Sequence, residues 1–249
     1  MRKTVLASAL LASFVAAPAV SFAEDAAPAA PAFTSNVTLA SEYIYRGIGQ
    51  TNRKPAIQGG FDYAHSSGLY VGTWASNISW LKDYQLATSS SMEWDFYGGY
   101  KTAFDDFGVD VGLLQYFYPG SGYGNNPNTL EGYVAGSWKT LTLKYSRAFS
   151  DLFGFVDSKG SGYLDLTGTY DLGDGFGVVG HVGRQKVQGG GNTSASYTDY
   201  KIGVTKDFNG TVAALSYITT NADSASYTPT LTGKDLGNGR VLFSVTRTF

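Results

Sequence analysis

The side chains of this chain that could do chemistry are mainly carboxylates, lysines, arginines and two histidines. Cysteine is absent, and His65 and His181 stand far apart in the sequence. Neither histidine lies in a His-Glu-x-x-His motif, and no Gly-x-Ser-x-Gly segment offers an activated serine. A serine and a histidine can still meet through folding alone, which keeps an outer-membrane lipid hydrolase as a weak alternative. We therefore expect no enzyme and no catalytic residue, and we interpret His181 as a polar group inside the fold.

Many charged residues alternate with apolar ones. Between residues 92 and 101, Trp94 and Phe96 alternate with Glu93 and Asp95. Successive side chains of a β-strand point to opposite faces, so this pattern predicts a strand with one apolar face and one charged face. The same alternation recurs at residues 141–145, 164–170 and 199–205. The segment 69–78 is ambiguous, because apolar residues occur at both parities.

The charged face defines the predicted site. Charges are costly against lipid, so strands that span a membrane turn them toward the interior of a barrel. Charges and hydrogen-bonding groups that line a pore select solutes. By parity, Gln58 and the following residues are predicted to line the lumen: Glu42, Arg46, Asp62, Glu93, Asp95, Lys101, Asp110, Glu131, Lys144, Asp165, His181, Lys201 and Arg240. Carboxylates outnumber bases in this set, which predicts a weak preference for cations or neutral polar solutes.

Turns of two alternating kinds separate the predicted strands. Short turns are expected at residues 65–68, 104–107, 139–140, 171–175 and 207–210, where Asp, Asn and Gly supply hairpin geometry. Longer polar loops are expected at residues 47–54, 79–90, 119–128, 149–160, 187–196 and 220–238. This regular alternation is typical of outer-membrane barrels, which have short periplasmic turns and long outer loops. The sequence therefore predicts an all-β fold, a transmembrane antiparallel up-and-down barrel of about 12 strands.

The N-terminus carries the features of a secretory signal peptide. Arg2 and Lys3 form a basic start, residues 4–17 are almost wholly apolar or small, and Ser21 and Ala23 precede a cut. The apolar run is shorter than the roughly 18 residues of a spanning helix. We predict a cleaved signal peptide at 1–23, an Ala/Pro-rich tether at 24–33 and the barrel at 34–249, located in the bacterial outer membrane.

Composition excludes several other classes of protein. The net charge is −2, and removal of the signal peptide with its two bases leaves 16 basic and 20 acidic residues, so no basic surface for nucleic acid is expected. Without cysteine there can be no disulfide scaffold. The chain has 32 Gly, 18 Tyr and 15 Phe, which favours β-structure. A mean hydropathy of −0.11 also fits strands whose every second residue faces a polar lumen.

Aromatic residues lie near the predicted ends of strands. An interface girdle on the periplasmic side is predicted from Tyr63, Tyr100, Trp138, Tyr170 and Phe249, and an outer girdle from Tyr43, Tyr45, Trp94 and Phe117. Cross-strand aromatic packing is the alternative explanation. The last strand, residues 239–249, ends on Phe249, and we expect it to engage the barrel-assembly machinery. Outer-membrane lipids and lipopolysaccharide are the other expected partners.

Glycine-rich and acidic loop segments predict no cofactor. Residues 120–124 and 189–191 lack the following helix and the Lys-Ser/Thr pair of a phosphate-binding loop. Asp151, Asp157 and Asp223 do not have the spacing of a calcium loop. The sequence thus predicts neither a bound cofactor nor a metal site.

The N-terminal third of the barrel region resembles the TorF-type family of outer-membrane porin-like proteins. The resemblance rests on residues 36–51, 54–63 and 68–77, with the pattern Tyr43-x-x-Arg46-Gly47 and Gln50 after the turn. Ile48-Gly49 departs from the family, which commonly has a serine before the glutamine. The resemblance implies an outer-membrane barrel and leaves the solute open.

We predict a porin-like channel for passive diffusion of small polar solutes or ions. Small barrels of about eight strands have filled interiors, whereas porins of about sixteen or more hold a channel. About twelve strands therefore also permit a closed or plugged barrel with an envelope-structural or adhesive role. A soluble ligand-binding barrel is disfavoured because it needs the reverse distribution of charge.

Overall fold

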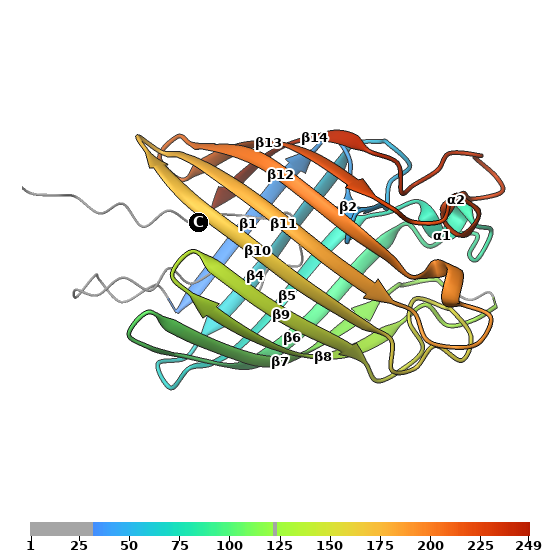
Figure 1. The fold of residues 1–249 in the computed structure, drawn as a ribbon, viewed down its shortest axis with the longest axis horizontal. Coiled ribbons are helices and arrows are strands. Elements are labelled where there is room, and N and C mark those ends of the chain that lie inside the picture. The colour runs from blue at the N-terminus through green and yellow to red at the C-terminus, as the bar shows by residue number, and fades with distance from the viewer. Residues whose placement is uncertain (1–31, 122–123) are drawn as a thin grey trace, which may run out of the picture.

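The computed structural model describes residues 32–121 and 124–249. The predicted signal peptide and most of the tether lie outside the described residues. The described part of the chain forms a closed antiparallel barrel of twelve strands, which confirms the predicted fold (Figure 1). The barrel strands are β1 (Phe33–Ala40), β4 (Ala56–Ala64), β5 (Leu69–Asn77), β6 (Met92–Phe104), β7 (Phe107–Phe117), β8 (Thr129–Trp138), β9 (Leu141–Ala148), β10 (Gly162–Gly173), β11 (Phe176–Lys186), β12 (Tyr197–Asp207), β13 (Thr211–Thr220) and β14 (Arg240–Thr248).

Pairing of the first and last strands closes the barrel. Every other barrel strand pairs with its neighbours in sequence, and β1 pairs with both β4 and β14. Main-chain hydrogen bonds join Ser35 and Phe249 in both directions, at 3.1 and 2.8 Å. The last residue of the chain thus completes the seam, and the sheet has no free edge.

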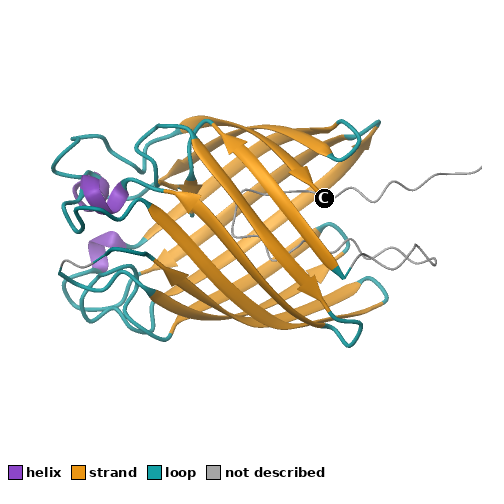
Figure 2. Cartoon of the chain, turned by 180° about the vertical axis from the view of Figure 1, so that it is seen from behind, coloured by secondary structure: helices purple, strands orange, loops and turns teal. Residues whose placement is uncertain are grey.

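Short turns gather at one end of the barrel and long loops at the other (Figures 1 and 2). We refer to these as the turn end and the loop end. The turns at the five predicted positions are present. In the last of them, Asn209 and Gly210 have φ of 55° and 87°, the left-handed backbone that Asn-Gly adopts easily in a tight hairpin. The loop end contains β2 (Ile44–Tyr45), β3 (Ile48–Gly49), α1 (Trp80–Asp83), the short helix η1 (Thr193–Ala195) and α2 (Ser224–Tyr227).

The barrel is apolar outside and polar inside. On β12, Ile202 is 68% exposed whereas its neighbour Lys201 is 8% exposed. On β5, where the sequence pattern was ambiguous, Leu69 and Val71 point outward and Tyr70 is buried. Among the described residues, no helix is long and apolar enough to cross a membrane.

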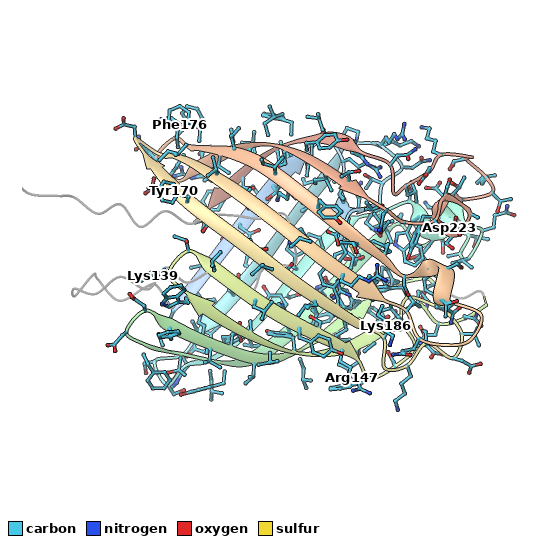
Figure 3. All side chains as sticks on the ribbon, viewed as in Figure 1. Lys139, Arg147, Tyr170, Phe176, Lys186 and Asp223 are labelled. Carbon is cyan, nitrogen blue, oxygen red and sulfur yellow. The ribbon has the colours of Figure 1, made fainter. Side chains whose placement is uncertain are left out.

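Most of the predicted girdle residues lie on the outer surface. Tyr100, Trp138, Tyr170 and Phe249 are exposed, and Figure 3 shows Tyr170 near the turn end. Tyr63 is half-buried and packs against Phe33, with ring centroids 5.1 Å apart. Their position at a lipid headgroup layer remains a prediction.

The predicted outer girdle is partly wrong. Trp94 and Phe117 are exposed on the outside of the barrel. Tyr43 and Tyr45 instead lie inside it, because β1 ends at Ala40 and the chain then turns into the barrel rather than continuing as a wall strand.

Because the outward face is apolar, we expect lipid to cover it and a charge placed there to destabilise the barrel. Ile202→Lys should lower the free energy of unfolding in lipid vesicles by about 2–4 kcal/mol. The control, Ile202→Leu, should leave it nearly unchanged. Urea titration followed by tryptophan fluorescence measures both. Equal stability of the two variants would contradict a lipid-facing position for Ile202.

Candidate functional site

The connection between β1 and β4, residues 41–55, folds into the barrel mouth. We call it the inserted loop. It contains the short β2–β3 hairpin, in which Tyr45 pairs with Ile48. Tyr43, Ile44 and Ile48 are buried. Glu42 and Arg46 lie inside the barrel, as their parity predicted. The sequence placed them on a wall strand, with the loop starting at residue 47, whereas in the structure both belong to the inserted loop.

Arg46 anchors the tip of the inserted loop to the far wall. Its Nη1 and Nη2 donate to the two carboxylate oxygens of Glu131 on β8, at 3.0 and 2.7 Å. Nη1 also donates to Oε1 of Gln185 on β11, at 2.9 Å. The guanidinium lies 4.3 Å from the ring centroid of Tyr163 on β10. In the strand order, β8 is five strands from β1 in one direction and seven in the other. The loop therefore crosses the mouth of the barrel.

The surroundings of Arg46 keep it charged. Burial, the largest single effect, lowers the pKa of the guanidinium, but Glu131 together with the neighbouring Tyr45 and Tyr116 raises it by more, so the pKa lies well above its ordinary value. The residue after it, Gly47, has φ of 79°. A Cβ on Gly47 would overlap Cγ2 of Thr220 and lie 2.7 Å from Cβ of Asp199. The Arg-Gly pair thus combines the anchoring charge with a backbone that fits against the wall.

Two further carboxylates hold the inserted loop. Glu93 on β6 accepts hydrogen bonds from the hydroxyls of Tyr43, at 2.7 Å, and Tyr118, at 2.8 Å. Glu42 in the loop pairs with Arg240 on β14 at 3.1 Å. These contacts bring together side chains from distant parts of the sequence.

The carboxylate of Asp95, unlike those of the other predicted acidic residues near the inserted loop, has no hydrogen-bond partner among the described residues. This holds for both carboxylate oxygens, and the residue is 0% exposed.

A belt of polar side chains lies on the inner wall closer to the turn end. Asp62 accepts a hydrogen bond from Tyr97 at 2.6 Å, and Asp110 accepts one from Tyr70 at 2.6 Å. Lys101 lies over the ring of Tyr70, 5.4 Å from its centroid, and Lys144 over that of Tyr133, at 3.9 Å. Lys201 is buried on β12, where it pairs in register with His181 on β11. Aromatic faces thus accompany the inward charges.

His181 lies between two carboxylates. Its ring nitrogens are 3.2 Å from Asp165 and 2.9 Å from Asp199. The hydroxyls of Tyr163 and Thr167 are 3.2 and 3.1 Å from the same ring. This arrangement holds the imidazole in place as a polar component of the wall, which agrees with its interpretation from the sequence.

The structure places every predicted lumen residue in a buried or half-buried position, none of them exposed. Whether these residues select a solute remains a prediction. Sequence reasoning missed the inward tyrosines: Tyr43, Tyr70, Tyr97, Tyr116, Tyr118, Tyr133 and Tyr163. A signal was present, because Tyr97 has the same parity as Glu93 and Asp95. Gln185 was also missed, although it shares the parity of His181.

A cavity of about 200 Å³ adjoins the inserted loop at the loop end. Arg46, Gln50 and Gln185 line it together with aromatic side chains from several loops. The aromatic lining includes Tyr45, Trp80, Tyr84, Tyr118, Phe153 and Tyr227. No group of His, Asp or Glu side chains suited to a metal ion occurs in residues 32–121 and 124–249.

A family model described as bacterial proteins of unknown function, Gcw_chp, matches residues 23–249. The chain belongs to the Gcw_chp family. No curated protein matches it in sequence. Solved structures share its fold at low identity. The KdgM porin has a TM-score of 0.55 and 8% identity, with 87% of this chain and 98% of that chain covered.

The NanC porin has a TM-score of 0.54 and 13% identity, with 88% of this chain and 99% of that chain covered. A KdgM porin in complex with disordered oligogalacturonate has a TM-score of 0.52 and 8% identity, with 87% and 97% covered. At these identities the likeness establishes a porin-like β-barrel fold for this Gcw_chp member.

The ion pair of Arg46 and Glu131 should contribute strongly to stability, because loss of one partner leaves the other buried and uncompensated. Arg46→Met should lower the free energy of unfolding by about 3–5 kcal/mol. Combining Arg46→Met with Glu131→Met should cost less than the sum of the two single changes. Unfolding in urea measures all three variants. Simple additivity would contradict a direct pair.

Proposed function

We propose that this Gcw_chp protein is an outer-membrane porin-like channel for passive diffusion of small polar solutes or ions, with a weak preference for cations. The observation that carries the proposal is a closed barrel with an apolar exterior and a charged, hydroxyl-rich interior, narrowed at its mouth by the inserted loop. An exterior of this kind suits lipid and an interior of this kind suits hydrated solutes. The shared fold with KdgM and NanC porins supports it.

Acidic residues near the mouth support the cation preference. Glu42 and Glu131 are each paired with an arginine, and Glu93 accepts hydrogen bonds from the neutral hydroxyls of Tyr43 and Tyr118. Without the fully buried Asp95, the carboxyl groups of Glu42, Glu93 and Glu131 still outnumber the two arginines, Arg46 and Arg240, that pair with two of them. Carboxylates that line a pore lower the barrier for positive charge.

Location and partners form part of the same proposal. The apolar exterior would contact outer-membrane lipids, and the loop end would face lipopolysaccharide. Phe249 at the closing seam would engage the barrel-assembly machinery, after export through a cleaved signal peptide. Membership of the TorF-type group, suggested by residues 43–50, belongs to this proposal as well. We propose no enzymatic activity. The network around His181 consists of carboxylates and hydroxyls on barrel strands, and none of these hydroxyls lies on the Gly-x-Ser-x-Gly turn that presents a catalytic serine.

A plugged barrel is the second candidate function. The observation that favours it is the inserted loop, which is held at Arg46, Tyr43 and Glu42 by three separate contacts. If these contacts persist at all times, the loop closes the mouth and the barrel serves the envelope as a structural or adhesive protein. Conductance distinguishes the two functions.

The channel proposal predicts stable conductance steps when the refolded mature chain is inserted into a planar bilayer. Under a potassium chloride gradient, the reversal potential should favour cations, because carboxylates predominate at the mouth. The control is the same bilayer with refolded protein that has not inserted, and it should show no current. A folded and inserted protein that conducts no current would contradict the channel and favour the plugged barrel.

The inserted loop should set the size of the conductance. Replacement of residues 44–49 by a shorter Gly-Ser linker removes the hairpin and its arginine, and the single-channel conductance should rise severalfold because the narrowest part is widened. The matched control replaces residues 188–192, a loop segment whose glycines are mostly exposed, and should leave conductance unchanged. Equal conductance of the two variants would show that the constriction lies elsewhere.

A further inference from the structure

We propose that the cavity at the loop end binds a neutral, single-ring aromatic solute that carries one hydrogen-bond acceptor. The inference deepens the proposed function, on which its relevance to transport rests, by naming a class of solute that the mouth would hold. It starts from size. A cavity of roughly 150 Å³ accommodates a benzene ring in a protein interior, and this one measures about 200 Å³. One substituted ring therefore fits within it.

The walls present aromatic carbon rather than hydroxyl groups. Tyr118 donates to Glu93 at 2.8 Å, Tyr227 to the carbonyl of Ala195 at 2.6 Å, and Tyr84 to the carbonyl of Ser226 at 3.3 Å. Because these hydroxyls already have partners, the rings offer their faces and edges to an occupant. A sugar would lose hydration at several hydroxyls without finding partners, which is costly. An aromatic ring gives up little hydration on entering the cavity, and it gains dispersion and edge-to-face contacts with the walls.

The rings are already arranged edge to face around the cavity. Trp80 and Tyr118 lie 5.4 Å apart between centroids at 89°, and Tyr45 and Phe153 lie 5.8 Å apart at 85°. A further ring can extend this pattern, since aromatic pairs prefer offset or edge-to-face contact at such separations. The hydroxyl bonds fix several of these rings, so the cavity is preorganised for its occupant.

One side of the cavity is polar and determines the substituent. Arg46 lines it, and among the described residues only three of the five guanidinium N–H groups have hydrogen-bond partners, two on Glu131 and one on Gln185. An acceptor such as a carbonyl oxygen can take one of the others. The charge of Arg46 is already balanced by Glu131, whose carboxylate would repel an anionic solute, and the guanidinium that lines the cavity would repel a cationic one. The occupant is therefore neutral.

The cavity lies between the loops that face outward. Tyr84, directly after α1, contacts the main chain of Ser226 in α2, and both residues line the cavity and are only half-buried. The two helices lie at the loop end in Figures 1 and 2. A solute from outside would thus reach this site, which residues of the inserted loop help to line.

Binding can be measured without conductance. The probe is 4-fluoroacetophenone, a neutral ring with one carbonyl, observed by fluorine NMR with the full folded protein in detergent micelles and with empty micelles as the blank. We expect saturable line broadening beyond the blank. Acetophenone should displace the probe, whereas cyclohexyl methyl ketone should displace it several times more weakly and D-glucose should not displace it.

Two variants locate the site. Leu86 also lines the cavity, so Leu86→Trp fills it and should abolish saturable binding. Phe153→Leu removes one wall ring and should weaken binding about three- to tenfold. The matched control, Phe104→Leu, removes an exposed ring on the outside of the barrel and should bind the probe like the unmodified protein. Heat-modifiable migration of all variants on gels verifies that each is folded.

The outcomes separate this inference from the proposed channel. Saturable binding that Leu86→Trp removes supports the site even if the bilayer stays silent, in which case the channel fails and the site stands. A conducting protein without saturable binding overturns the site and leaves the channel. Displacement by glucose, or equal binding by Leu86→Trp, also overturns it.

Discussion

Closure of the main-chain hydrogen-bond ladder is the constraint on which the rest of this structure depends. A lipid environment has no water to pair with a free strand edge, so a sheet within it must close on itself. Here closure needs β14 to reach β1, and the Ser35–Phe249 bonds place the last residue of the chain in that seam. Once the sheet is closed, each strand must place alternate side chains outside and inside. The apolar exterior and the polar interior then both follow from the alternation of apolar and polar residues along each strand.

The width of a twelve-stranded barrel explains why the interior contains a loop. Barrels of about eight strands are filled by side chains alone, and a wider one leaves space along its axis. In this chain, tyrosines and lysines reach inward from the walls, and the inserted loop occupies the mouth. Burial of Glu93 and Glu131 there requires donors, which Tyr43 and Arg46 of the loop provide. Tyr118 and Tyr116, outside the loop, also donate to these two carboxylates, but the arginine that balances the charge of Glu131 comes from the loop alone among the described residues.

Local pattern predicted the walls well and the mouth poorly. Alternation over a few residues decides which face of β6 or β12 is apolar, and the turn residues after each strand mark its end, so both could be read from the sequence. Residues 41–46 also alternate and look like a continued strand. Their actual path depends on Glu131 and Gln185, which lie 85 and 139 residues from Arg46. The inward position of the tyrosines was also not predicted. A tyrosine ring suits a lipid interface and its hydroxyl suits a buried carboxylate, and only the fold decides between these two positions.

The two halves of the inner wall differ, and this difference bears on how the proposed channel would treat a solute. On β1, β4, β13 and β14, Asp62 and Arg240 are the only charged side chains on the inward face of the described strands. Gln58, Ile218 and Leu242 are uncharged and buried, and most of the others are small or carry hydroxyls, as the Thr38–Thr246 hydroxyl contact at 2.7 Å illustrates. The charges instead gather on β6 to β12, with Lys and Asp neighbours such as Lys101 and Asp110 in direct register. The inserted loop starts and ends on the uncharged half and is anchored on the charged half. A dipolar solute that passes between them would meet a fixed field directed across the barrel, so the walls would orient it even where they do not bind it.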